Sequence, residues 1–113
     1  MASGGGDAWG GTLAVLGVGT ATVRDGTLAY NRAIGGDGQD GGNGLGGGVY
    51  VTDAASVRVF RSLVTANEAM GGIGGAGGDG VGGGVYNLGS FEFDKRTVIE
   101  GNDASTSHSD IYP

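Results

Sequence analysis

Acidic side chains recur at a regular interval in two glycine-rich stretches of the chain. Asp37, Asp40 and Asn43 stand three residues apart in the first stretch, and Asp79 lies in the second. Carboxylate and amide oxygens on a flexible backbone suit Ca²⁺, which takes six to eight oxygen ligands. Asp37, Asp40 and Asp79 are therefore candidate calcium ligands, and calcium is the one cofactor that the residues suggest.

A second interpretation of these aspartates is that they keep a glycine-rich surface soluble. Calcium-binding nonapeptide repeats carry an apolar residue directly after the aspartate. Here Gly38, Gly41 and Gly80 follow Asp37, Asp40 and Asp79. The departure from the nonapeptide pattern favours solvated aspartates over calcium ligands.

Residues for catalysis are sparse. Asp53 is isolated among apolar and hydroxyl side chains, whereas glycoside cleavage needs two carboxylates at a fixed separation. The single histidine, His108, lies in a serine-rich segment without an aligned partner, and no nucleophile or phosphate-loop motif occurs. We expect a protein that is not an enzyme.

Aromatic residues offer a binding alternative. Tyr50 and Tyr86 occupy equivalent places in two related segments, with Trp9 near one end, and a ladder of aromatic rings can bind a glycan. The ordinary interpretation is a cross-strand pair that stabilises a sheet. A flat glycine-rich surface could also bind ice, but a regular threonine column is missing.

Composition limits the remaining classes. The 113 residues fit one domain, and 29 of them are glycine, several times the usual share of about 7%. The net charge of −6 argues against nucleic acid or an anionic membrane as partner. The longest apolar run, residues 13–18, is too short for membrane insertion, and the first residues lack the pattern of a signal peptide. Without cysteine, no disulfide framework can form.

The chain is an internal repeat. The stretch at 35–50 matches the stretch at 71–86, so that Gly46 aligns with Gly82 and Tyr50 with Tyr86, 36 residues later. Alignment divides the single domain, residues 1–113, into coils of about 10–45, 46–81 and 82–113. The third coil aligns if two residues are lost after Asn87 and one is gained near Arg96.

Each copy alternates apolar and polar residues, which predicts three short strands per copy. Equivalent apolar and asparagine positions would form inward-facing columns when the copies stack as parallel strands about 4.8 Å apart. The predicted core ladder comprises Leu13, Val49 and Val85; Val23, Val59 and Phe93; Leu28, Val64 and Ile99; and Asn31, Asn67 and Asn102.

The sequence GGGVY, a small turn, an alternating strand and the pattern L/V-x-x-N-x-A resemble the glycine-rich coils of right-handed parallel β-helix proteins. Those proteins belong to the pectate-lyase-like superfamily and include bacterial surface and autotransporter-type proteins. The resemblance covers about residues 10–104. It implies an all-β, right-handed solenoid at the cell surface or outside the cell, and it leaves function open among enzymes, adhesins and structural shafts.

Glycine-triplet stretches lengthen each coil beyond that family's plain coil. A three-residue period suits polyproline II geometry, in which bare glycine faces let neighbouring backbones approach. A flexible glycine loop is the alternative. The predicted packing glycines are Gly35, Gly38, Gly41, Gly44, Gly71, Gly74, Gly77 and Gly80.

Uncapped ends of such a stack would favour self-association, because solenoids normally close their ends with a polar cap. We expect a structural repeat protein that stacks head to tail into an extracellular filament or surface shaft, its partner being a second copy of itself. The alternative is a calcium-stabilised or glycan-binding adhesin module cut from a longer surface protein, with ice binding less favoured.

Overall fold

The computed structural model describes residues 7–113, which form sixteen short β-strands and no helix. Alternating apolar residues, many of them β-branched, favour strands over helices here. The strands form five sheets in which every paired neighbour is parallel. The prediction of an all-β protein with stacked parallel strands is confirmed.

Each sheet collects the equivalent strands of successive copies. The first contains β1 (Ala8–Trp9), β6 (Gly44–Leu45) and β11 (Gly80–Val81); the second, β16 (Ile111–Tyr112), β12 (Val85–Asn87), β7 (Val49–Val51) and β2 (Leu13–Val15). The third contains β13 (Ser90–Phe93), β8 (Ser56–Phe60) and β3 (Thr20–Arg24); the fourth, β14 (Val98–Ile99), β9 (Leu63–Thr65) and β4 (Thr27–Ala29); the fifth, β15 (Asp103–Ala104), β10 (Glu68–Met70) and β5 (Arg32–Ile34).

The pairing register places equivalent residues over one another. Val49 pairs with both Leu13 and Val85. In the third copy Ser90 pairs with Ser56, and further along Val98 pairs with Leu63. The offset thus falls from 36 to 34 after Asn87 and returns to 35 after Arg96, as the alignment predicts.

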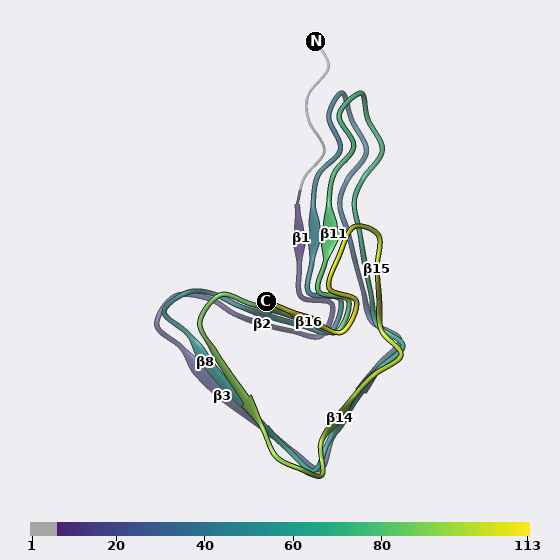
Figure 1. The fold of residues 1–113 in the computed structure, drawn as a ribbon. Coiled ribbons are helices and arrows are strands. Elements are labelled where there is room, and N and C mark those ends of the chain that lie inside the picture. The colour runs from purple at the N-terminus through teal and green to yellow at the C-terminus, as the bar shows by residue number, and fades with distance from the viewer. Residues whose placement is uncertain (1–6) are drawn as a thin grey trace.

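Figure 1 shows the path of one copy as a triangle with a long arm at one corner. Strands β2, β3 and β4 follow the three sides in turn. The side that ends in β5 leads into the glycine stretch, which runs outward and returns through β6 to the next copy. Two more strands per copy occur than the three predicted, because the segments entering and leaving the arm also pair between copies.

Valines of the middle copy form the centre of the core. Residues fully buried include Val49, Val51, Val57, Val59 and Val64. Leu13, Val23 and Leu28 of the first copy pack against this cluster and are partly buried.

Phe93 departs from its predicted place in the core. Its side chain is 49% exposed, although its column partner Val59 is fully buried. Phe93 belongs to β13, which has a neighbour on one side only within residues 7–113. Its ring instead lies 5.9 Å from that of Phe91.

The glycine stretches form ordered arms of two limbs. Within one arm, Gly42 N–H donates to Gly36 O at 2.9 Å, and Gly78 N–H donates to Gly72 O at 3.0 Å. Between arms, Gly41 N–H donates to Ala76 O at 2.8 Å. Each limb therefore contacts the other limb of its own arm as well as the neighbouring copy, whereas the sequence predicted neighbours above and below only.

The C-terminal segment lies on the third copy. Residues 105–113 make no third arm; they return directly to β16, where Ile111 pairs with Val85 and packs against the core. This docked segment corrects the expectation of uncapped ends at the third copy. The segment was missed because its offset from the preceding copy is 26 residues rather than 36.

Candidate functional site

The stack has two outer faces. Within residues 7–113, β3, β4 and β5 are edge strands on one side, and β13, β14 and β15 are edge strands on the other. We call these strands the first-copy face and the third-copy face. Edge strands present backbone N–H and C=O groups on their unpaired side, which makes them templates for pairing with another chain.

Burial along the apolar columns of the third sheet falls toward both faces. Val57 and Val59 in β8 are fully buried. Their partners Ala21 and Val23 on the first-copy face are only partly buried. On the third-copy face, Phe93 is about half exposed.

A ladder of asparagines closes one corner of every copy. Asn67 Oδ1 accepts from the backbone N–H and the Nδ2 of Asn31, both at 3.0 Å. Asn102 Oδ1 accepts from the same two groups of Asn67, at 3.0 and 2.9 Å. Asn67 Nδ2 also donates to Leu28 O, and Asn102 Nδ2 also donates to Val64 O.

Asp110 ends this ladder. Its Oδ1 accepts from the backbone N–H of Asn102 at 3.1 Å and from Asn102 Nδ2 at 3.0 Å. A carboxylate only accepts hydrogen bonds, so it can terminate a chain of donors but cannot extend it. Asp110 thus takes the place that the asparagine of a further copy would fill.

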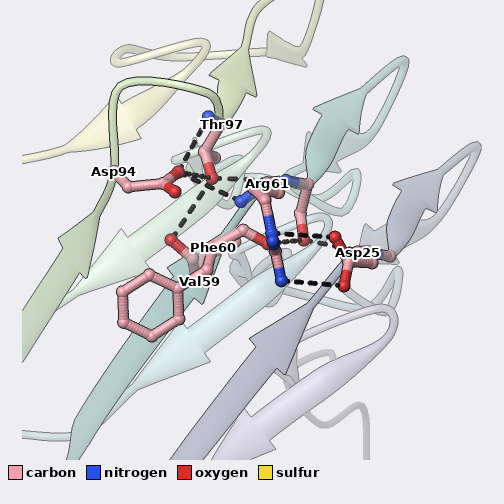
Figure 2. Close-up of polar contacts among 8 residues, drawn as sticks. Asp25, Val59, Phe60, Arg61, Asp94 and Thr97 are labelled. Atoms are coloured by element: carbon pink, nitrogen blue, oxygen red, sulfur yellow. Dashed lines mark hydrogen bonds and ion pairs between the residues drawn. The ribbon is translucent and has the colours of Figure 1, made fainter.

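A second corner carries charged and hydroxyl groups, shown in Figure 2. Arg61 bridges two copies: its Nε lies 3.0 Å from Asp25 Oδ1, and its backbone N–H donates to Asp94 Oδ1 at 3.0 Å. The hydroxyl of Thr97 also donates to Asp94 Oδ1, at 2.8 Å. The bond from Arg61 N–H, followed by that from Thr97, lowers the pKa of Asp94, because both favour the ionised carboxylate.

Tyrosines form a column beside the second sheet. The rings of Tyr50 and Tyr86 are stacked with centroids 5.4 Å apart, and Tyr112 continues the stack at 4.6 Å. His108 meets Tyr112 edge-on at 4.8 Å. Burial is the main reason that the pKa values of Tyr50 and Tyr86 are raised. The faces of these rings lie against one another, and Tyr50 is buried; the Trp9 side chain lies outside what the structure describes.

Two of the three candidate calcium ligands accept hydrogen bonds from backbone amides, and the third lies beside a hydroxyl. Asp37 Oδ1 accepts from Ile73 N–H at 2.7 Å, and Asp40 Oδ1 accepts from Ala76 N–H at 3.3 Å. Asp79 Oδ1 lies 3.5 Å from the hydroxyl of Thr106. Among residues 7–113, no group of three or more Asp, Glu, His or Cys side chains is placed to hold a metal ion.

Most of the predicted packing glycines lie against backbone. A Cβ atom would overlap a carbonyl oxygen at Gly35, Gly41, Gly44, Gly71 and Gly80, and a backbone nitrogen at Gly74. Gly38 donates its N–H to Ile73 O at 3.0 Å. Gly77 is a correction, since nothing lies within 4 Å of its Cβ position. It follows the bend at the arm's tip, where the neighbouring residues are exposed.

The two residues considered for catalysis, Asp53 and His108, both lie at the surface. Asp53 is exposed in the turn after β7. The outer surface of the third sheet has a shallow hollow of about 260 Å³, lined by Thr20, Ala21, Thr22, Ser56 and Arg58. This lining holds one guanidinium and three hydroxyls but no carboxylate. Residues 7–113 also contain no helix that could cross a membrane.

Asp110 and Tyr112 are site residues that the repeat alignment missed. The signal available was the tripeptide Asp110-Ile111-Tyr112, which resembles Gly84-Val85-Tyr86 in placing an aliphatic residue before tyrosine. Its shortened offset hid the match. Comparison of the chain with protein-family models, curated proteins and solved structures finds no match.

Proposed function

We propose that this chain is a structural repeat protein, a right-handed parallel β-helix whose copies stack end to end into an extracellular filament or surface shaft. Parallel strands joined by crossovers are right-handed in about 98% of cases, which supports the handedness. The glycine limbs, with their three-residue period and close backbone contacts, suit polyproline II geometry. The resemblance to pectate-lyase-like surface proteins supports the location.

The observation that carries the proposal is that the apolar columns through Val57 and Val59 are sealed in the middle copy and open at both faces. Val57 and Val59 are fully buried between two neighbours, whereas Phe93 has one neighbour and is half exposed. A second copy laid on the third-copy face in the same register would supply the missing neighbour. Burying apolar surface in this way contributes about 25 cal/mol per Å².

The two faces are complementary in size. In the continued register, Phe91 would lie on Ala21 of the second copy and Phe93 on Val23, since Val57 and Val59 pair with these residues within one chain. Ile99 would lie on Leu28, because Val64 pairs with both. Large side chains on one face thus meet smaller or equal ones on the other, which favours close packing.

Charge also matches. Within the chain, a guanidinium nitrogen of Arg32 lies 3.6 Å from a carboxylate oxygen of Glu68. Asp103 is the next residue in that column, so in the continued register it would meet Arg32 of the second copy. Asp94 follows Phe93 and would in the same way approach Arg24. Opposite charges across an edge fix the register more than they add affinity.

The test is sedimentation or sizing of the full chain over a wide concentration range, with electron microscopy of the products. We expect rod-like assemblies that grow with concentration. Phe93→Lys, at a half-exposed side chain, should prevent growth, because it places a charge in the open column. The matched control is Ile73→Lys at the arm's tip, where the side chain is 77% exposed.

The two variants separate ordered stacking from other outcomes. Ile73→Lys should assemble as the unmodified chain does. A chain that stays monomeric at millimolar concentration, with its C-terminal segment docked or released, overturns the proposal. Assembly that Phe93→Lys leaves unchanged overturns the assigned interface.

A further inference from the structure

Residues 105–113 occupy the place that a stacked second copy would need for its first strands. Ile111 pairs with Val85, and Val85 is the last apolar residue of the column Leu13, Val49, Val85. In the register of the proposed stack, Leu13 of the second copy would continue that column. Ile111 and Leu13 of the second copy therefore claim the same position.

The same conflict recurs at the arm. Val81 forms a parallel bridge with Ser107, and Val81 also pairs with Leu45, which pairs with β1. Residue 107 thus lies where β1 of a second copy would come. Residues 107 and 111 thus occupy the places of β1 and β2 of a second copy. Residues 105–113 therefore overlap the whole segment of the second copy from β1 to β2.

The asparagine corner shows the same substitution in its polar groups. Asp110 accepts the two hydrogen bonds from Asn102 that Asn31 of a second copy would accept, as Asn67 does from Asn31 within the chain. Residues 105–113 thus supply the strand β16, the bridge from Ser107 to Val81 and the carboxylate that ends the asparagine ladder. By contrast β13, β14 and β15 carry no such cover within residues 7–113.

We propose that β16 and β2 of a second copy compete for the edge of β12, so that copies stack only when residues 105–113 leave the third copy. This inference rests on the proposed end-to-end stacking and names its control element. The stack then joins through β13, β14 and β15 as well as through β12.

The docked segment is held by contacts that can be exchanged. Ile111 and Tyr112 are partly buried, and residues 105–109 are exposed. Two of its main contacts have an equivalent in the second copy: Leu13 for Ile111 and Asn31 for Asp110. Ala14 would stand in the place of Tyr112, since Ala14, Tyr50, Tyr86 and Tyr112 form one column. Exchange loses the stacking of Tyr112 on Tyr86 and the hydrogen bond that Ser105 Oγ accepts from Gly71 N–H, and it gains the pairing of three further sheets.

The first experiment weakens docking in the full chain. Ile111→Lys places a charge where the Ile111 side chain packs against the core, and Ile73→Lys is the matched control. We expect Ile111→Lys to assemble at a concentration at least about tenfold lower than the unmodified chain, because the binding-competent fraction rises. Ile73→Lys should show no shift. Circular dichroism reports whether each variant keeps its strands, and Asp110→Ala is a second, milder way to release the segment.

The second experiment locks the segment in place. Tyr86 and Tyr112 pair directly on neighbouring strands, which lie about 4.8 Å apart, so the double variant Tyr86→Cys, Tyr112→Cys falls within the span of a disulfide. The oxidised double variant should stay monomeric, and reductant should restore assembly.

The outcomes separate this inference from the proposed function. Equal assembly of the unmodified chain, Ile111→Lys and the oxidised lock, all abolished by Phe93→Lys, overturns competition and leaves stacking intact. Assembly of Ile111→Lys that persists with Phe93→Lys in the same chain also overturns it, because the exposed β12 edge then associates without register. If none of these proteins assembles, stacking itself is overturned.

Discussion

Asn102 accepts from Asn67 through one oxygen that binds both the backbone N–H and the Nδ2, at 3.0 and 2.9 Å. Asn67 is fully buried and repeats the arrangement toward Asn31. Such a ladder needs a side chain that accepts on one side and donates on the other. Asparagine does both. An ionised aspartate only accepts, so it fits only at the last position of the ladder.

The first prediction follows from this polarity. Asn67→Asp should destabilise the protein by about 3 kcal/mol or more, because a buried carboxylate would face Asn102 Oδ1 and Leu28 O without donors. Asp110→Asn should stay within about 1 kcal/mol, since an amide oxygen accepts the same two bonds from Asn102. Urea unfolding followed by circular dichroism measures both. Similar losses for the two variants would contradict the role assigned to the ladder.

The second prediction concerns the arms. At Gly78 an added Cβ would overlap Gly42 O, whereas at Gly77 it would meet nothing within 4 Å. Gly78→Ala should therefore cost about 1–3 kcal/mol or more, or undo the arm's contacts. Gly77→Ala should change stability by less than about 1 kcal/mol and in the stabilising direction. Hydrogen exchange at Gly41 and Gly42 reports on the arm directly. A loose arm would tolerate both changes equally.

Much of this architecture could be predicted from the 36-residue period. A repeat that keeps Val49 over Leu13 and under Val85 leaves parallel stacking as its natural solution, and the pairing has this register. The shortened turn after Asn87 was also readable, because Ser56 and Ser90 begin equivalent alternating runs.

Other features were outside the reach of periodicity. The fold of each arm depends on backbone contacts such as Gly42 N–H to Gly36 O, and glycine offers no side chain whose pattern would reveal them. Exposure of Phe93 depends on which strands lack a neighbour, a property of the whole stack. The docking of Ile111 breaks the period and so escaped an alignment built on it.

The third prediction concerns calcium. Asp37 and Asp40 accept hydrogen bonds from Ile73 and Ala76, so they join neighbouring arms without an ion. We expect the melting temperature with excess calcium to equal that with chelator within about 1 °C. Asp37→Asn, whose amide oxygen can still accept from Ile73, is the matched variant and should melt near the unmodified protein. A rise of several degrees with calcium, lost in Asp37→Asn, would restore the metal-site interpretation.

The fourth prediction follows from the second corner, where hydrogen bonds from Arg61 N–H and then Thr97 lower the pKa of Asp94 from its usual 3.8. A carboxyl whose pKa is lower folded than unfolded binds fewer protons when folded. Its contribution to stability is therefore present above the unfolded pKa and is lost as pH falls through the folded pKa. The loss should begin near pH 4 and continue below it.

Asp94→Asn removes this dependence while keeping an oxygen that can accept from Arg61 N–H. We expect the variant to be less stable than the unmodified chain at pH 7 and to converge with it as pH falls from about 5 to 2. Asp53→Asn removes one negative charge from an exposed turn and serves as the control for net charge. Urea unfolding at each pH measures the difference. A constant gap between Asp94→Asn and the unmodified chain would show that the hydrogen bonds at this corner do not depend on ionised Asp94.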